Sequence, residues 1–293
     1  MKRFIRKAIG WGVATSFFLS GCRRRRVAAY RKQGTVLSVF GHNSSPMVLD
    51  SLLGWLIRKG FNFISTDELL AVRDGTRAWK SQMAWLTFDD GWAGFESNLL
   101  PILKKYDVPA TIFVAPNETE RGKIWTNSVI GAVDGWQAWY GMTADDRYAA
   151  VDKVLDGIPL GSSRLDRQLA TKDELCRLAT DPLITLENHT YTHLSCNHRP
   201  VAEVMDEVKK TRDILLEWTG RTPRLVCYPF GHCTVETDAE IRSFGLVPVK
   251  SFPGQMTLDT IGECRNMFHD AMGLYENVGR VLQAWPRVKV RMV

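Results

Sequence analysis

The sequence has 293 residues, 45% of them hydrophobic and 24% charged, which is ordinary for a soluble globular protein and leaves room for one large domain or two small ones. Its formal net charge of +6 would suit a nucleic-acid-binding protein, but the excess is concentrated near the start of the chain. No helix-turn-helix, zinc-finger or RNP-type pattern accompanies that basic segment, so nucleic acid is not an expected partner.

Residues 1–33 form a basic and apolar arm. Its apolar stretch, 8–21, has the length of a signal-peptide core and is short for a transmembrane helix. LSGC at 19–22 resembles a bacterial lipoprotein cleavage box, which would make Cys22 a lipidation site in an exported protein. Six of the eleven residues that follow Cys22 are Arg or Lys, and positive charge at this position opposes export under the positive-inside tendency.

A second interpretation fits both flanks of the apolar stretch. A helix bracketed by Lys and Arg lies well on an anionic membrane surface. We therefore expect the protein at the cytoplasmic face of the membrane or in the cytoplasm, with an exported lipoprotein as the alternative. The six cysteines have no CxxC spacing, and if Cys22 were lipidated an odd five would remain, so reduced thiols are expected.

From residue 34 onward, short apolar runs alternate with helical patterns. Helices are predicted after Ser45-Pro46, after Ser65, which forms a capping box with Glu68, and over 99–106 and 201–219. The runs that predict strands are 36–40, 61–64, 83–88, 110–114, 183–186, 225–227 and 246–249. Residues 117–167 are expected to form an insertion over one face. Without repeats or a linker, 34–293 is predicted to be one domain.

Apolar strands that alternate with helices predict an α/β fold with a parallel sheet, either open or closed into a barrel. Unusual polar clusters follow four of these strands directly. They are GHN at 41–43, DD at 89–90, ENH at 187–189 and YPFG at 228–231. The carboxyl ends of the strands are where barrel and open α/β enzymes place their chemistry.

Asp89 and Asp90 would repel each other at the end of a buried strand unless a cation or a proton stood between them. His189 and His193 are four residues apart, roughly 13 Å in an extended strand and about 6 Å in a helical turn. A shared metal therefore requires a turn here. With Asp90 they would form a set of two histidines and one carboxylate, typical of an open catalytic zinc site, while Asp89 remained available as a base.

These motifs resemble those of the polysaccharide deacetylases, the NodB-homology or carbohydrate esterase 4 group. TFDD at 87–90 is similar to the family's TFDD signature, HTYTH at 189–193 to its H[ST]xxH metal motif, and YPFG at 228–231 to its third motif, RxP[YF]G. The resemblance runs over roughly residues 35–253. It implies a deformed (β/α)7-type barrel, an acetylated carbohydrate substrate and a divalent metal, most often Zn²⁺.

The resemblance also implies roles for particular residues. Asp89 would be the general base, and the backbone N–H of Phe230 would hold the oxyanion. The metal ligands would be Asp90, His189 and His193. An acid must also protonate the leaving amine, and His269, in a segment loosely similar to the family's late motif, is the first candidate, with His42 the second.

The sequence departs from the family pattern at Cys227, where the third motif has an arginine that orients the catalytic aspartate. Arg265 is a candidate substitute from another strand. His198 and His232 are expected at the surface. Trp92 and Trp125 could stack on a sugar ring, but buried core positions are the expectation for both.

The hypothesis is a metal-dependent hydrolase that removes the N-acetyl group of an amino sugar in a polymeric, oligomeric or lipid-linked saccharide. Two alternatives stay open. One is an esterase acting on O-acetyl carbohydrates, and the other is a catalytically impaired carbohydrate-binding protein of the same fold, which Cys227 and the weak late motif would explain.

Overall fold

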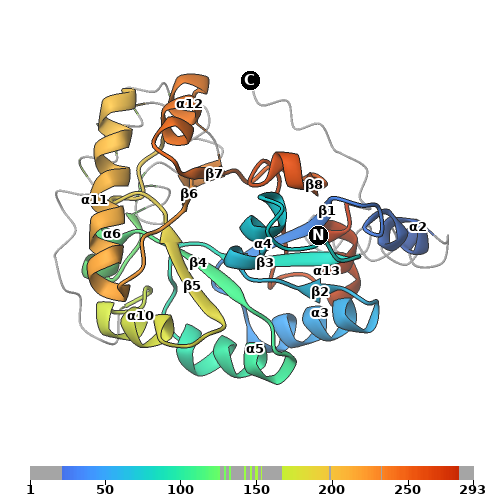
Figure 1. Ribbon diagram of the computed structural model, residues 1–293. Coiled ribbons are helices and arrows are strands. Elements are labelled where there is room, and N and C mark those ends of the chain that lie inside the picture. Colours follow the sequence, from blue (N-terminus) through green and yellow to red (C-terminus); the bar gives the residue numbers. More distant parts are fainter. Residues whose placement is uncertain are drawn as a thin grey trace. The chain divides into compact units, whose positions relative to one another are not determined.

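The computed structural model describes residues 22–125, 167–197, 199–231 and 233–283, with positions 129, 132, 142, 146, 149, 150 and 153 between them. These residues form two compact units. The first comprises residues up to 88, 97–111 and 249 onward, and the second comprises 89–96 and 112–248 (Figure 1). Most of the predicted insertion at 117–167, together with His198 and His232, lies outside the described residues.

The strands of the first unit surround β1 (Thr35–Gly41). Its parallel neighbour is β3 (Met83–Phe88), in a register that pairs Val36 with Met83, and β2 (Asn62–Phe63) is parallel to the other edge of β3. The short strands β8 (Met256–Thr257) and β9 (Asn266–Met267) both pair with β1. Every residue of β1 and β3 is buried, as the apolar runs in the sequence predict.

The predicted parallel sheet also carries one strand that was not predicted, β8, which runs antiparallel to β1 at the edge of the sheet. The sequence contains no apolar run that would predict a strand at β8. It has two residues, and Leu258 N–H just beyond it donates to the carbonyl of Gly34. Such a short strand is held by tertiary contacts rather than by its own sequence pattern.

Helices of the first unit begin where the sequence predicts caps. Ser45 caps α3 (Pro46–Arg58), and Ser65 and Glu68 form the predicted capping box of α4 (Thr66–Arg73). The others are α2 (Cys22–Ala29), α5 (Leu100–Tyr106) and α13 (Leu274–Val281), with the π-helical turn η1 (Phe95–Leu99) before α5 and the 3₁₀ turn η3 (Leu258–Thr260) after β8. α3 packs against both α5 and α13.

The end of the N-terminal arm packs on the first unit. Val27 of α2 and Tyr30 are buried, and the Tyr30 ring meets Phe61 edge-on with centroids 5.6 Å apart. Gln82 N–H donates to the Tyr30 carbonyl at 3.0 Å. The domain boundary at residue 33 stays a prediction, although these contacts begin before it.

The second unit contains the strand order β7-β6-β5-β4. These strands are β4 (Ala110–Val114), β5 (Ile184–Asn188), β6 (Leu225–Cys227) and β7 (Val247–Val249). Its helices are α6 (Pro116–Arg121), α10 (Lys172–Ala179), α11 (Val201–Thr219) and α12 (Val235–Ser243), with the 3₁₀ turn η2 (Pro229–Gly231). α11 packs on β5 and α12 through Val204, Met205 and Val208, which supply buried apolar side chains at helical spacing.

Glu187 fastens two strands of the second unit from inside the core. Its Oε2 accepts the backbone N–H groups of Arg224 and Leu225 at 2.7 and 2.8 Å. Because the side chain is buried, desolvation raises the pKa of this carboxyl from 4.5 to about 7.

We expect Glu187→Gln to stabilise the protein at alkaline pH. The pKa of Glu187 is higher in the folded state than in the unfolded chain, so between pH 4.5 and 7 the native state binds more protons than the unfolded state. The native state therefore loses stability as the pH rises through that window. Gln keeps an acceptor for both N–H groups without the buried charge. The variant should match the wild type near pH 5 and exceed it by about 3 kcal/mol at pH 9. Urea unfolding with chelator at both values tests this, and an equal effect at both would contradict it.

No helix in the described part of the chain is long and apolar enough to cross a membrane. The apolar stretch at 8–21 lies outside that part. All six cysteines are described and all are free thiols.

Candidate metal centre and active site

Residues that follow strand ends meet in the second unit. Asp89 and Asp90 begin this unit directly after β3, and His189 follows β5. Asp90, His189 and His193 are at most 5% exposed and place one ligand atom each within 4.8 Å of one another. The structure thus brings together the three residues predicted to be metal ligands.

The spacing of these atoms suits a small tetrahedral cation. Asp90 Oδ1 lies 3.4 Å from the Nε2 atoms of both His189 and His193. Tetrahedral zinc ligands at 2.0–2.1 Å from the metal stand about 3.3–3.4 Å apart, so the observed spacing matches that of ligands sharing one ion. Two imidazoles and a carboxylate also leave a coordination position open for water.

The hydrogen bonding of His189 orients its ring for this task. Its Nδ1 lies 2.8 Å from the Cys227 carbonyl oxygen, which can only accept, so Nδ1 carries a proton and Nε2, which faces Asp90, is the ring atom that a metal would bind. Burial opposes the charged form of this ring, but proximity to Cys227 and the contact with Asp90 raise its pKa well above the usual value. Protons therefore compete with a cation for Nε2.

His193 differs from His189. Burial lowers the pKa of His193, so this imidazole is neutral near pH 7, the form in which histidine binds a metal. Its ring lies edge-on to that of His189, with centroids 4.9 Å apart. The two rings approach a common point rather than stacking.

Trp92 holds the other oxygen of the Asp90 carboxylate. Its Nε1–H donates to Asp90 Oδ2 at 3.1 Å, while Oδ1 faces the histidines. Trp92 is therefore not the buried core aromatic that was expected, but a half-buried residue that orients a candidate ligand. Only the short spacing from Asp90 to Trp92 hinted at this contact.

We expect Trp92→Phe to weaken Zn²⁺ binding by about 10- to 100-fold, because the ring remains while the hydrogen bond that orients Asp90 is lost. Competition titration with a fluorescent zinc chelator measures the change. Trp218→Phe, on α11, is the matched control and should leave the affinity unaltered. Wild-type affinity in Trp92→Phe would show that the indole N–H has no such role.

Asp89 is 4% exposed and lies beside Cys227. Cys227 Sγ lies 3.9 Å from Asp89 Oδ1. Asp89, His189 and Cys227 also place ligand atoms within 4.8 Å of one another, a second set that shares His189 with the first. This second set was not predicted, because the sequence comparison with the motif indicates only the loss of a positive charge at Cys227.

The backbone of these loops adopts unusual conformations. Among the described residues, seven that are not glycine have positive φ, and four of them are Asp90 at 74°, Thr190 at 62°, His193 at 56° and Phe230 at 61°. Left-handed conformations cost energy in such residues and cluster at functional sites. The segment from His189 to His193 is the turn that a shared metal requires, although it is not helical.

Side chains of neighbouring residues hold this turn. Thr190 N–H donates to Asn188 Oδ1, and Leu194 N–H donates to Thr190 Oγ1, both at 2.9 Å. Thr192 N–H donates at 2.7 Å to Glu207 of α11, a carboxyl whose pKa is raised by burial. The turn is therefore tied to β5 and α11.

Two aromatic rings lie next to the candidate ligand His193. Phe230, whose backbone N–H was predicted to hold the oxyanion, has its ring 5.4 Å from His193 and 5.9 Å from Trp125. Trp125 is 1% exposed, as expected for a core aromatic, and donates from Nε1 to the Thr192 carbonyl at 2.9 Å. Glu118 Oε2 accepts from Trp125 N–H, and burial raises the pKa of this carboxyl to about 7.

The candidates for the general acid belong to the first unit. His269 is exposed, its N–H donates to Asn277 Oδ1 at 2.8 Å, and its Nδ1 accepts from Ala271 N–H at 3.0 Å. These bonds leave Nε2 as the ring atom open to a substrate. His42 is also exposed, with its ring 5.7 Å from that of Phe40.

Arg265, the candidate substitute for the motif arginine, is fully buried in the first unit. Its guanidinium donates to Thr87 Oγ1, Ser251 Oγ and the Lys250 carbonyl, at 3.0 to 3.1 Å, and lies over the Phe40 ring. Thr87 is the first residue of the TFDD motif. Arg265 therefore supports the strand that leads into Asp89.

A model of the polysaccharide deacetylase family matches residues 77–249. This range exceeds half of the chain and includes both aspartates and both histidines. The chain belongs to the polysaccharide deacetylase family. Among curated proteins, none matches the sequence.

Solved structures of polysaccharide deacetylases share the fold. The Streptococcus pyogenes deacetylase PplD, solved in complex with acetate, matches with a TM-score of 0.61 and 17% identity, covering 84% of this chain and 96% of that one. The BpsB deacetylase domain from Bordetella bronchiseptica matches with a TM-score of 0.56 and 20% identity, covering 79% of this chain and 95% of that one. IcaB from Ammonifex degensii matches with a TM-score of 0.56 and 16% identity, covering 85% of this chain and 97% of that one. At these identities the likeness establishes the (β/α)7-type deacetylase fold alone.

Proposed function

We propose that this family member is a metal-dependent deacetylase that hydrolyses the N-acetyl group of an amino sugar. The observation that carries the proposal is the placement of one oxygen of Asp90 at 3.4 Å from two imidazole nitrogens, with a second buried carboxylate, Asp89, adjacent in the chain. Family membership supplies the substrate class, an acetylated carbohydrate.

Asp90, His189 and His193 would hold the cation, with Zn²⁺ the best match to their donor types and spacing. When bound, a divalent ion supplies Lewis acidity that polarises the acetamide carbonyl and acidifies water. As the oxygen of the attacking water bonds to the carbonyl carbon, Asp89 accepts a proton from that water. The N–H of Phe230 donates to the oxyanion that develops on the carbonyl oxygen.

Cleavage of the carbon–nitrogen bond requires a proton on the departing nitrogen. The proposed donor is His269, through Nε2, with His42 as the second candidate. The products are acetate and a free amine on the sugar. The positive charge that the amine then carries distinguishes this reaction from O-deacetylation, which releases a neutral alcohol.

Acetate release from N-acetylglucosamine oligomers and from acetylated xylan, with and without chelator, tests the proposal. We expect release from the oligomers, abolished by the chelator and restored by Zn²⁺. Release only from xylan would favour the O-acetyl esterase. No release from either, with Zn²⁺ bound, would favour the carbohydrate-binding alternative, which is motivated by the replacement of the motif arginine by Cys227.

For localisation we propose the cytoplasmic face of the membrane, on the basis of the basic residues that flank the apolar stretch at 8–21. The alternative is export with lipidation at Cys22. Fractionation of tagged full-length protein and of a variant without residues 1–26 tests this. The deletion should release the protein from the membrane fraction, and unchanged membrane association would overturn the proposal.

A further inference from the structure

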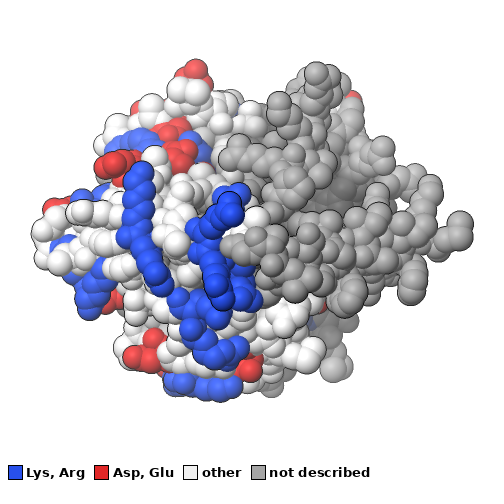
Figure 2. All heavy atoms as spheres, turned by 90° about the vertical axis from the view of Figure 1, so that its right-hand side faces the viewer, with Lys and Arg blue, Asp and Glu red and all other residues white. Residues whose placement is uncertain are grey.

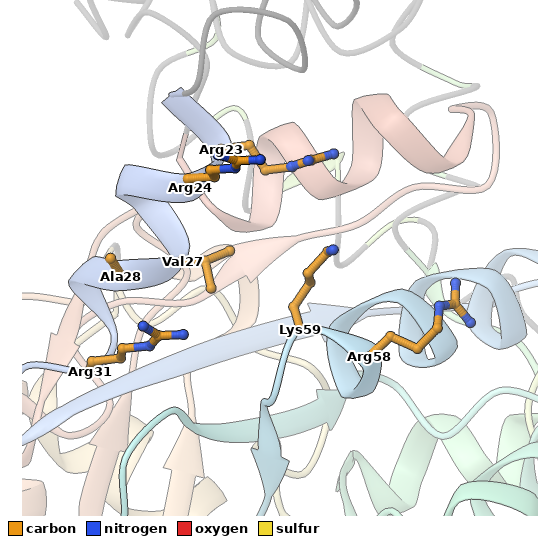
Figure 3. A pocket seen from close by; sticks show the side chains of 7 residues that line it. All are labelled: Arg23, Arg24, Val27, Ala28, Arg31, Arg58 and Lys59. Atoms are coloured by element: carbon orange, nitrogen blue, oxygen red, sulfur yellow. The ribbon is translucent and has the colours of Figure 1, made fainter.

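A basic cavity lies in the first unit between α2 and the end of α3. Its volume is about 540 Å³, enough for a group larger than a single inorganic ion. Figure 3 shows side chains extending into one space from two segments that are far apart in the sequence, the α2 segment and Arg58-Lys59. The lining residues are Arg23, Arg24, Val27, Ala28, Arg31, Arg58 and Lys59.

Charge is concentrated in this cavity. Five of its seven lining residues are Arg or Lys, and none of these described lining residues is Asp or Glu. Arg58 and Lys59 form no ion pair with any carboxylate in the part of the chain that the structure describes. Figure 2, which views the side where α2 lies, shows Lys and Arg side chains gathered on this face. Cationic side chains that line one cavity repel one another, and an anion bound between them would offset that repulsion.

A buried glutamine holds the two walls together. Gln82 is 7% exposed; its Oε1 accepts from Arg31 Nε at 3.1 Å, and its Nε2 donates to the Lys59 carbonyl at 2.8 Å. The backbone N–H of Gln82 also donates to the Tyr30 carbonyl, and the φ of Gln82 is 57°, in the left-handed region. Gln82 therefore fixes the backbone of the two walls and one of the cationic side chains, Arg31, which indicates a preformed cavity.

We propose that this cavity binds a phosphate or diphosphate group. Guanidinium groups match phosphate oxygens in bidentate geometry, and the lysine adds a compact point charge. Five cations around one space favour a multiply charged anion over a single carboxylate. The site differs from general attraction of the basic arm to a membrane, because Arg58 and Lys59 come from α3 and its end, outside the arm.

Pyrophosphate binding by the full-length protein, measured by calorimetry in 150 mM NaCl, tests the proposal. We expect saturable binding that the double substitution Arg58→Gln and Lys59→Gln weakens by roughly tenfold or more. Both side chains are exposed, so the fold should persist, which the thermal midpoint checks. Arg73→Gln with Lys80→Gln removes the same charge from exposed positions of the same unit and should change the affinity less than twofold.

Two further measurements, of vesicle binding and of oligonucleotide binding, identify the source of the phosphate. Sedimentation with phosphatidylcholine vesicles containing phosphatidic acid, reversed by pyrophosphate and reduced in the Arg58/Lys59 variant, would assign the site to a phosphorylated lipid headgroup. Pyrophosphate binding without vesicle binding would assign it to a soluble phosphorylated compound. Tighter binding of a single-stranded oligonucleotide, equally reduced in the Arg58/Lys59 variant, would replace the proposal with a nucleic-acid site.

Two results would overturn the site altogether. One is a wild-type protein that shows no saturable pyrophosphate binding. The other is equal weakening in the Arg58/Lys59 and Arg73/Lys80 variants, which would mean that the ligand senses only net charge. Neither readout involves acetate release, so the deacetylase proposal stands or falls separately.

Discussion

Asp89→Asn is expected to lower the rate of acetate release by about 10²- to 10⁴-fold while leaving Zn²⁺ affinity within a few-fold of the wild type. Asn keeps the shape of the buried side chain but cannot accept the proton from water. Because Asp90 rather than Asp89 lies 3.4 Å from both imidazole Nε2 atoms, the substitution should spare the metal. Initial rates on N-acetylglucosamine oligomers and a zinc titration of the same preparation measure the two quantities.

A loss of zinc affinity in Asp89→Asn that parallels the loss of rate would contradict this assignment. It would favour the second set of ligand atoms, from Asp89, His189 and Cys227. Cys227→Ser separates the two cases, since it removes the sulfur ligand but changes neither imidazole. Under our assignment Cys227→Ser keeps wild-type zinc affinity.

Asp90→Asn is expected to weaken Zn²⁺ binding by more than about 100-fold and to abolish acetate release at limiting zinc. Asp90 supplies the only carboxylate of the proposed ligand set, and its charge also offsets that of the ion. The neighbouring carboxylates Asp89 and Asp90 should thus behave differently, one affecting the rate and the other the metal. Competition titration and acetate assays at graded zinc concentrations give both values.

The matched control for Asp90→Asn is Asp259→Asn, an exposed residue of η3 that makes the same chemical change. It should leave affinity and rate unchanged. Recovery of full activity in Asp90→Asn at saturating zinc would still agree with a ligand role, because mass action can offset weaker binding. Unchanged zinc affinity in Asp90→Asn would contradict the ligand role of Asp90.

Local sequence patterns predicted much of the fold because the relevant interactions are local. The apolar run 83–88 became a fully buried strand, and Ser65 with Glu68 formed the capping box. The four-residue spacing of His189 and His193 predicted a turn, because geometry allows a shared ion only there. These features depend on neighbours within a few residues.

Features set by distant contacts were not predicted. The antiparallel strand β8 has two residues and no periodic pattern. The second set of ligand atoms joins Cys227 to Asp89, from which 138 positions separate it. The contact of Trp92 with Asp90 is close in sequence, but it depends on how the tertiary structure orients the indole N–H. No sequence pattern predicts that the Glu118 and Glu187 carboxyls are buried, yet burial raises the pKa of each to about 7. Such effects depend on the environment that the whole unit creates.

Anomalous diffraction at the zinc absorption edge, from crystals of the zinc-loaded protein, tests the central claim most directly. We predict one strong peak with Asp90 Oδ1 and the Nε2 atoms of His189 and His193 at about 2.0–2.2 Å. A peak bonded to the Cys227 sulfur at about 2.3 Å, or none between Asp90 and the two histidines, would contradict the account.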